Sequence, residues 1–230
     1  MIELHSWPTP NGMKISVMLE ETGIDHSVHP VSIRDGEQFA PAFLDISPNN
    51  RIPAIIDTAP VDGGAPISVF ESGAILIYLA NKSGLFGGAQ TRDKIEIVQW
   101  LMWQVGGLGP MAGQNGHFNI YASEKIPYAI DRYISETARL YGVMDKRLAD
   151  RDYLSGEYSI ADIACYPWIV PHDAHKQDLA QHPNLKRWFE TIAARPAVVK
   201  AYADKDHLYP TNDAPMTDEE HARLFGNKRA

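Results

Sequence analysis

The pattern of hydrophobic residues changes near residue 84, and this change limits the architectures open to the chain. Before it, short alternating segments typical of strands are interleaved with helical segments. After it, only long segments with a period of about 3.6 residues occur. Such a chain folds as an α/β domain followed by an all-α domain, and 230 residues suffice for two domains. We expect domains over residues 1–84 and 91–207, followed by a polar tail over residues 208–230.

The first domain is expected to follow the order β-α-β-α-β-β-α. Its strands are predicted over residues 2–6, 28–33, 53–57 and 66–70, and its helices over residues 13–22, 37–46 and 73–82. Gly23 and Gly84 are suitable helix stops. Pro30 cannot donate a hydrogen bond to a neighbouring strand, so the second strand should lie at an edge of the sheet.

The second domain is expected to be entirely helical. Residues 92–118 and 127–149 predict a helical hairpin, because their apolar residues recur at helical spacing. Ser159 and Asp162 have the spacing of a capping box, which predicts the start of a buried helix. Residues 217–226 carry the same kind of cap and a glycine stop, which predicts a short helix in the tail.

Charge and cysteine content exclude several classes of function. The net charge of -8 and the lack of a basic cluster argue against nucleic acid as a partner. Cys165 is the only cysteine, which excludes an internal disulfide and a multi-thiolate zinc site. His172, His175 and His182 lack further ligands nearby in the sequence, so no metal site is expected.

The sequence also indicates where the chain resides. The amino terminus has no basic segment followed by a long apolar one. No segment approaches the roughly 18 apolar residues that a membrane span requires. We therefore expect a soluble, cytoplasmic protein with no membrane partner.

Three motifs have the order and spacing of those in the cytosolic glutathione transferases, and they give the chain a resemblance to that superfamily. They are Asn49–Ala54 (NNRIPA), Phe70–Ile75 (FESGAI) and Ser159–Asp162 (SIAD). The resemblance extends from residue 1 to about residue 205. It implies a thioredoxin-like first domain with a mixed four-stranded sheet, a helical second domain and a homodimer.

Three further segments narrow the resemblance to the bacterial nu class, relatives of the yeast nitrogen-regulator prion protein. They are Pro8–Gly12 (PTPNG), Gly106–Met111 (GGLGPM) and Ile126–Tyr133 (IPYAIDRY). This class implies an enzyme that uses glutathione to reduce disulfides. The substrates that such an enzyme would use together with glutathione are small thiols, disulfides or electrophiles.

The resemblance implies that Ile52 presents its backbone to the peptide part of glutathione and that the Ile52–Pro53 bond is cis. The alternative is an ordinary proline that begins a strand. Glu71 and Ser72 stand where a strand leads into a helix, whose free N–H groups and dipole favour an anion. The γ-glutamyl carboxylate could bind there, with Glu71 taking the ligand's ammonium. Alternatively, Ser72 is only a helix cap.

Thr9 and Asn11 occupy the turn where the resemblance places the glutathione sulfur, with Asn11 as the first candidate donor and Ser6 as a weaker one. Lowering a thiol pKa of about 8.5 by ~2 units requires about 2.7 kcal/mol, which one or two hydrogen bonds and a helix start supply. Better-known transferase classes use tyrosine, serine or cysteine here, and the difference favours thiol-disulfide exchange. The alternative is a simple turn and helix cap.

Three more residues are candidates to bind glutathione. Gln38 and Arg51 could bind its glycyl end, although each could equally be a solvated polar residue. By resemblance, Arg132 reaches a glutathione carboxylate in the partner subunit, where a guanidinium can bind through two hydrogen bonds. The alternative for Arg132 is an ion pair on the helix surface.

The function expected from the sequence is glutathione-dependent disulfide reduction through a stabilised glutathione thiolate. A site could hold two glutathione molecules or the disulfide form, and no metal. The alternatives are conjugation of glutathione to electrophiles and a non-catalytic, glutathione-binding regulatory module.

Overall fold

The computed structural model describes residues 1–209 and 216–226. The chain divides into two compact units, one of Met1–Lys82 with the described residues from Lys200 onward, the other of Ser83–Val199. The sequence assigns residues up to 207 to the helical domain, whereas the structure assigns those from Lys200 onward to the first unit. Long-range contacts explain this difference. The Lys200 ammonium lies 2.7 Å from the Glu20 carboxylate, and Tyr209 packs edge-on against Trp7.

The first unit contains a mixed four-stranded sheet with the order β2-β1-β3-β4. Its strands are β1 (Ile2–Ser6), β2 (His26–Pro30), β3 (Ala54–Asp57) and β4 (Ile67–Phe70). β1 pairs in parallel with β2 and antiparallel with β3, which in turn pairs antiparallel with β4. The expected element order, the mixed sheet and the edge position of the second strand are confirmed.

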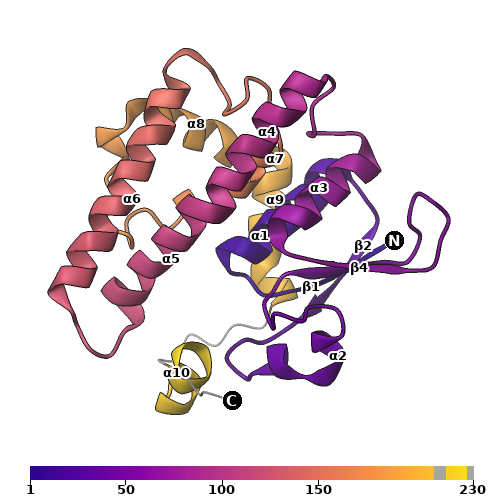
Figure 1. Ribbon diagram of the computed structural model, residues 1–230, viewed down its shortest axis with the longest axis horizontal. Helices are drawn as coiled ribbons and strands as arrows, with labels where there is room; N and C mark the ends of the chain where they lie inside the picture. The colour runs from indigo at the N-terminus through magenta and orange to yellow at the C-terminus, as the bar shows by residue number, and fades with distance from the viewer. Residues whose placement is uncertain (210–215, 227–230) are drawn as a thin grey trace. The chain divides into compact units, whose positions relative to one another are not determined.

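Helices cover both faces of this sheet (Figure 1). They are α1 (Pro10–Thr22), α2 (Pro41–Leu44) and α3 (Ser72–Ser83), with a short 3₁₀ turn, η1 (Glu37–Phe39), before α2. α1 and α3 lie on one face and α2 on the other. A core of fully buried residues lies between the sheet and the layer formed by α1 and α3. It includes Ile2, Leu4, Ile15, Met18, Leu19, Ile55, Ile75, Leu76 and Leu79.

Two of these helices differ from the expected bounds for local reasons. α1 begins at Pro10 rather than Met13, because Thr9 caps it and proline is suited to the first helical position. The continuous helix expected over residues 37–46 is wrong, since the chain forms η1 and the short α2 instead. Pro41 has no N–H with which to continue a helix from η1, and it begins α2.

The second unit is helical throughout its regular structure. Its helices are α4 (Thr91–Trp103), α5 (Gly109–Gly116), α6 (Pro127–Arg147), α7 (Ile160–Ile169) and α8 (Pro183–Ala193). π-helical turns at Gln104–Leu108 and His117–Tyr121 follow α4 and α5, and short 3₁₀ turns occur at Leu148–Asp150 and Leu179–Gln181. The predicted capping box of Ser159 and Asp162 is confirmed. α9 (Pro196–Leu208) spans the division between the units.

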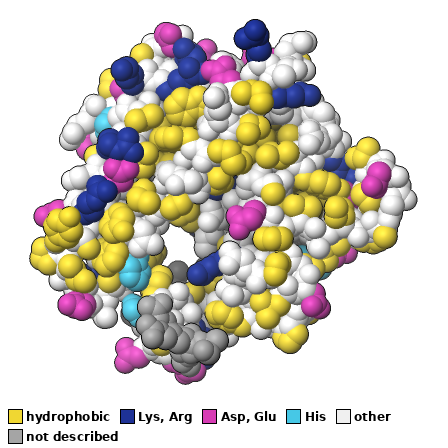
Figure 2. Space-filling view, in the orientation of Figure 1, with side chains coloured by type: hydrophobic (Ala, Val, Ile, Leu, Met, Phe, Trp, Pro, Cys, Tyr) yellow, Lys and Arg dark blue, Asp and Glu magenta, His cyan; other side chains and the backbone are white. Residues whose placement is uncertain are grey.

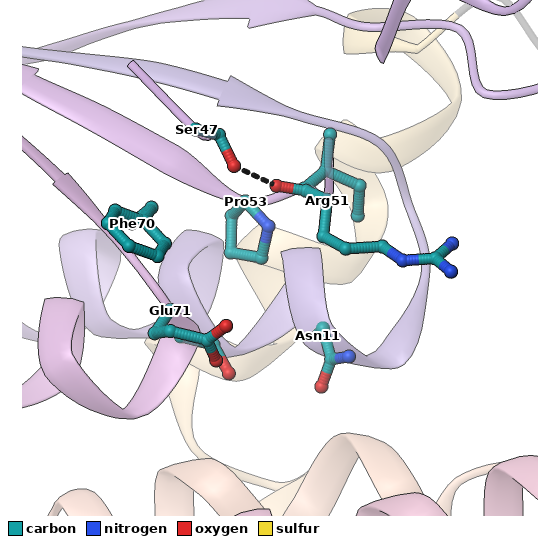
Figure 3. A pocket seen from close by; sticks show the side chains of 8 residues that line it. Asn11, Ser47, Arg51, Pro53, Phe70 and Glu71 are labelled. Atoms are coloured by element: carbon teal, nitrogen blue, oxygen red, sulfur yellow. Dashed lines mark hydrogen bonds between the residues drawn. The ribbon is translucent and has the colours of Figure 1, made fainter. Parts of the chain in front are cut away.

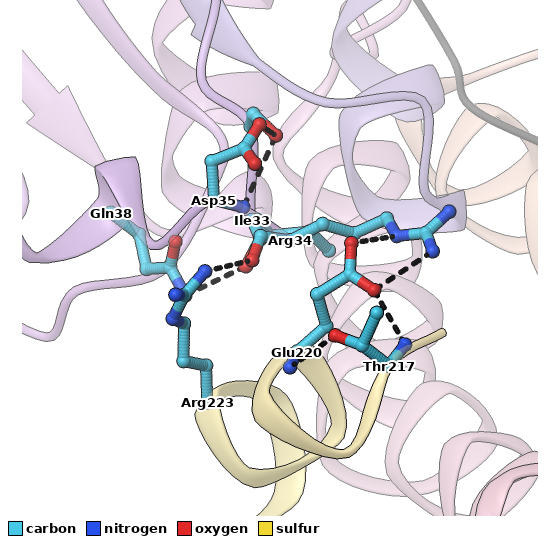
Figure 4. Close-up of polar contacts among 8 residues, drawn as sticks. Ile33, Arg34, Asp35, Gln38, Thr217, Glu220 and Arg223 are labelled. Carbon is cyan, nitrogen blue, oxygen red and sulfur yellow. Dashed lines mark hydrogen bonds and ion pairs between the residues drawn. The ribbon is translucent and has the colours of Figure 1, made fainter. Parts of the chain in front are cut away.

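The described part of the tail forms α10 (Asp218–Phe225). Thr217 and Glu220 form its capping box and Gly226 follows its last turn, so the predicted tail helix is confirmed. α10 lies against the loop that precedes η1, where Arg34 pairs with Glu220 and Arg223 donates to the Arg34 carbonyl (Figure 4).

On the face drawn in Figure 2, lysine and arginine side chains are dispersed, with acidic side chains among them. Across residues 1–209 and 216–226, no helix has the length and apolar character needed to cross a membrane.

Candidate functional site

The junction of β1 and α1 positions the first candidate side chain. Thr9 is the N-cap of α1, and its Oγ1 accepts a hydrogen bond of 3.4 Å from the Gly12 amide. Gly12 must be small, because a Cβ there would lie 2.0 Å from the Trp7 carbonyl oxygen and 2.4 Å from the Ser6 Oγ. The turn therefore packs tightly against the end of the strand. Asn11, between Thr9 and Gly12, is half-buried and lines a pocket.

The loop before β3 supplies a second wall of the pocket. Ser47 is buried, and its Oγ donates a 2.7 Å hydrogen bond to the Arg51 carbonyl, while the Asn50 amide donates to the Ser47 carbonyl. Asn50 adopts a left-handed conformation with φ 49°, which asparagine tolerates. The bond between Ile52 and Pro53 is cis, as predicted.

The junction of β4 and α3 supplies the third wall. Glu71 has φ 69°, a left-handed conformation that costs a non-glycine residue about 1–3 kcal/mol and is concentrated at functional sites. It turns the chain so that α3 begins at Ser72. The first N–H groups of this helix have no carbonyl partner within it, so its start is suited to bind an anion.

Asp57 at the end of β3 holds α3 in place. Its carboxylate accepts hydrogen bonds of 2.7 Å from the Tyr78 hydroxyl and the Lys82 ammonium. Burial acts to raise the pKa of Asp57, but the bonds from Lys82 and Tyr78 outweigh it and lower this pKa below its ordinary value. Burial and the bond to Asp57 raise the pKa of Tyr78, which therefore keeps its proton.

Together these three segments enclose a cavity of about 270 Å³ (Figure 3). It is lined by Asn11, Ser47, Arg51, Ile52, Pro53, Phe70, Glu71 and Ser72. The Arg51 guanidinium lies at the opposite end of the pocket from the Glu71 carboxylate. A carboxylate and a helix start at one end, a guanidinium at the other and backbone between them suit a small, charged, peptide-like ligand.

The structure thus brings together most of the residues that the sequence singles out, but it places three of them elsewhere. Thr9 does not line the pocket and caps α1. Gln38 is buried, with its Nε2 donating 3.3 Å to the Ile33 carbonyl and its Oε1 without a partner. Arg132 belongs to α6 in the second unit, where it lies 4.0 Å from Glu136.

Ser6, the weaker candidate, is fully buried and donates a 3.4 Å hydrogen bond to the Trp7 carbonyl. Ser47 and Phe70 line the pocket without having been predicted. Position was the only signal available, because Phe70 is the first residue of the motif Phe70–Ile75 and Ser47 lies two residues before the motif Asn49–Ala54.

Sequence reasoning also missed Lys14, whose side chain is buried in α1. Its Nζ donates a 3.1 Å hydrogen bond to the Ser72 Oγ at the start of α3. The signal was present, because Lys14 stands between Met13 and Ile15 in a helix whose middle is apolar. A lysine among buried residues requires a polar partner.

Metal-ligating side chains and the Cys165 thiol are the other candidate groups within residues 1–209 and 216–226. This part of the chain contains no cluster of three or more histidine, cysteine, aspartate or glutamate side chains that could hold a metal ion. Cys165 is fully buried in α7 among apolar residues, which is typical of a packing residue rather than a reactive thiol.

Two family models match the chain. The model described as the glutathione S-transferase N-terminal domain matches residues 9–82, and that of the glutathione S-transferase C-terminal domain matches residues 125–196. Among curated relatives, Disulfide-bond oxidoreductase YfcG of Escherichia coli is 56% identical over 202 residues, 87% of this chain and 94% of the relative. Transcriptional regulator URE2 of Saccharomyces cerevisiae is 32% identical over 84% of this chain and 64% of that protein.

Solved structures of similar proteins contain glutathione. A glutathione transferase family member from Pseudomonas fluorescens, with two glutathiones bound, has a TM-score of 0.82 and 44% identity, over 87% of this chain and 91% of that one. A glutathione transferase from Pseudomonas putida, with one glutathione disulfide bound per subunit, also has a TM-score of 0.82. It is 41% identical over 87% of this chain and 90% of its own.

Proposed function

Since the chain belongs to the cytosolic glutathione transferase superfamily, in the group that includes Disulfide-bond oxidoreductase YfcG, we propose that it reduces disulfides with glutathione. The observation that carries the proposal is the pocket at the start of α1. There a half-buried amide, that of Asn11, faces a cavity also lined by Pro53, Glu71 and Ser72. The lining offers hydrogen-bond donors to a bound thiol and contains no cysteine, so glutathione supplies the reactive sulfur.

In this proposal glutathione lies along the pocket with its γ-glutamyl group at α3. The carboxylate accepts hydrogen bonds from Ser72 and the first N–H groups of the helix, and Glu71 takes the ammonium. The backbone of Ile52, before Pro53, faces the cysteinyl part. Arg51 binds the glycyl carboxylate, because its guanidinium lies at the far end from Glu71.

Three predicted residues have supporting roles in the proposal. Thr9 fixes the start of α1 as its cap, and thereby the position of Asn11. Gln38 supports the segment between β2 and α2 through its bond to the Ile33 carbonyl. The protein acts as a homodimer, in which Arg132 of the partner subunit binds a glutathione carboxylate.

The chemistry begins with ionisation of the bound thiol. Asn11 donates to the sulfur, and a hydrogen bond to an ionised group contributes about 1.5–3 kcal/mol, equivalent to a pKa lowered by roughly 1–2 units. The thiolate attacks one sulfur of the substrate disulfide, forming a mixed disulfide and releasing the other half as a thiolate. A second glutathione thiolate attacks the glutathione sulfur of the mixed disulfide. Glutathione disulfide and the second substrate thiolate leave, and each released thiolate takes up a proton from water.

The stoichiometry agrees with what similar proteins bind. Two glutathiones supply the two electrons that reduce one disulfide, and the Pseudomonas relatives bind two glutathiones or one glutathione disulfide. The reaction requires a supply of reduced glutathione, which places the protein in the cytoplasm in this proposal.

The test is glutathione-dependent reduction of hydroxyethyl disulfide, coupled to glutathione reductase, in the intact chain and in Asn11→Ala. Loss of the donor should lower the rate about 10- to 100-fold near neutral pH, and less at higher pH, where the thiol ionises unaided. Asn81→Ala is the matched control, because Asn81 is exposed on α3 and does not line this pocket. Equal rates in Asn11→Ala and the intact chain would remove Asn11 from the mechanism.

The same preparation separates the alternatives. Fast turnover of an aryl halide with little disulfide reduction would make conjugation the main activity. Tight glutathione binding without turnover of either substrate would make the chain a regulatory binding module. The similarity to Transcriptional regulator URE2 is the observation that favours testing for the second alternative.

A further inference from the structure

Lys14 is a buried cation beside the proposed glutathione pocket. Lys14 is 1% exposed to solvent, and its Nζ lies 3.1 Å from the Ser72 Oγ. Removing an ammonium from water costs several kcal/mol unless polar partners compensate, and the Ser72 hydroxyl is one such partner of Lys14. Lys14 stands three positions after Asn11 on α1, which places both residues on the same side of that helix.

The hydrogen bond has a fixed direction. An ammonium has only donors, so Lys14 donates and the Ser72 hydroxyl oxygen accepts. With one lone pair of the oxygen engaged, the hydroxyl proton is directed to another acceptor. Ser72 lines the pocket, so its proton is available to a ligand there. The cation behind the oxygen also polarises the hydroxyl and strengthens it as a donor.

We propose that Lys14 is a positioning residue that acts through Ser72 to select ligands carrying the free γ-glutamyl carboxylate. This inference rests on the proposed function, because it assumes that glutathione occupies the pocket. Lys14 lies outside the lining of the cavity and acts on the ligand through the Ser72 hydroxyl and through its charge. Without Lys14, the Ser72 hydroxyl at the start of α3 would have no adjacent cation and could rotate.

The charges around the pocket explain why such a device is useful. Glu71 is an anion in the lining, and alone it would repel a ligand carboxylate bound at the adjacent helix start. A buried cation behind Ser72 offsets that repulsion on one side, while Glu71 remains available for the ligand's ammonium on the other. Lys14 and Glu71 therefore match the carboxylate and the ammonium of the γ-glutamyl group, and they discriminate against ligands that lack either charge.

The test compares two ligands by isothermal titration calorimetry. They are glutathione and the analogue 4-aminobutyryl-cysteinyl-glycine, which keeps the amine and the thiol but lacks the γ-glutamyl carboxylate. The intact chain should bind the analogue at least about 10-fold more weakly than glutathione. Lys14→Met should lose about 10-fold or more in glutathione affinity and less than about 3-fold in analogue affinity.

Four further variants make the result specific. Ser72→Ala should show the same ligand dependence, and the double variant should bind glutathione no more weakly than the weaker single variant, because the two residues act as one unit. Lys14→Gln tests the charge with a shorter polar side chain and should also lose discrimination. Lys146→Met, at an exposed position of α6, should leave both affinities unchanged.

In turnover, Lys14→Met should raise the KM for glutathione while kcat at saturation stays within about 3-fold, since the sulfur is held elsewhere. Equal losses of affinity for both ligands in Lys14→Met would mean that Lys14 only stabilises the fold, and would overturn the proposal. Circular dichroism spectra showing that both Lys14 variants are unfolded would overturn it as well. Equal affinity of the intact chain for the two ligands would also overturn it. If the intact chain binds no glutathione, the proposed function itself fails.

Discussion

Arg34 and Glu220 form a two-pronged ion pair across 186 positions of sequence, with Nε 3.1 Å from Oε1 and Nη2 3.2 Å from Oε2 (Figure 4). The Glu220 carboxylate also accepts a 2.6 Å hydrogen bond from the Thr217 amide, which completes the cap of α10. The bond from Thr217 and the Arg34 guanidinium together lower the pKa of Glu220 to about 2. One carboxylate therefore both starts α10 and fastens it to the loop that precedes η1.

Replacing Glu220 by glutamine should release α10. The neutral amide cannot accept the paired hydrogen bonds from Arg34, so amide hydrogen exchange over residues 218–225 should become faster. Because the folded-state pKa of Glu220 lies below its ordinary value of 4.5, the stabilisation is present above that pH and is lost as pH falls toward 2. Asp218→Asn on the same helix is the control, and matching exchange in both variants would contradict the assignment.

Gly12→Ala should disrupt the turn that carries Asn11. The added Cβ would lie 2.0 Å from the Trp7 carbonyl oxygen, which is backbone and cannot rotate away. We expect a loss of about 1–3 kcal/mol in the free energy of unfolding, together with weaker glutathione binding, measured by urea denaturation and calorimetry. Gly142→Ala in α6 meets no atom within 4 Å and should instead stabilise the chain by about 0.5–1 kcal/mol. An unchanged free energy of unfolding in Gly12→Ala would contradict the close packing of this turn against Trp7.

Local signals predicted much of the fold. The caps at Ser159 and Thr217 and the left-handed Gly23 each act within a few residues, so the sequence reveals them directly. The edge position of β2 followed from Pro30 alone. The resemblance then predicted residues of the pocket that no local pattern would have joined.

Longer-range relationships could not be predicted in this way. Lys14 and Ser72 are 58 positions apart, and the burial that makes their bond significant exists only once α1 and α3 are packed. The same holds for the residues from Lys200 onward, which the contact with Glu20 joins to the first unit. The sequence makes Gln38 a candidate to bind glutathione, and only the fold shows that its Nε2 donates to the Ile33 carbonyl.

Asp162→Ala should be among the most damaging substitutions in the second unit. The buried Asp162 carboxylate accepts hydrogen bonds from the Leu154 amide, the Trp188 indole and both the amide and hydroxyl of Ser159. Alanine would leave these buried donors without an acceptor, at an expected cost of about 3–5 kcal/mol in the free energy of unfolding. Thermal and urea denaturation measure this cost, with exposed Asp152→Ala as the control. A loss below about 1 kcal/mol would show that water replaces the carboxylate.

His175 makes the second unit sensitive to acid. It is 5% exposed, and its Nδ1 has no hydrogen-bond partner. Burial, assisted by the nearby His172, lowers the pKa of His175 from 6.5 to about 4. The folded chain therefore resists protonation that the unfolded chain accepts, so stability is complete above pH 6.5 and declines as pH falls toward 4.

The variant His175→Gln isolates this contribution, because every other titrating group is common to both proteins. The free energy of unfolding of the intact chain should fall relative to that of His175→Gln by on the order of 2 kcal/mol between about pH 7 and about pH 4.5. Urea denaturation at a series of pH values measures the difference. Since Asn115 and Gln177 bind the His175 carbonyl rather than its ring, they hold the backbone in both proteins. Parallel pH profiles would mean that the imidazole is hydrated in the folded chain and titrates normally.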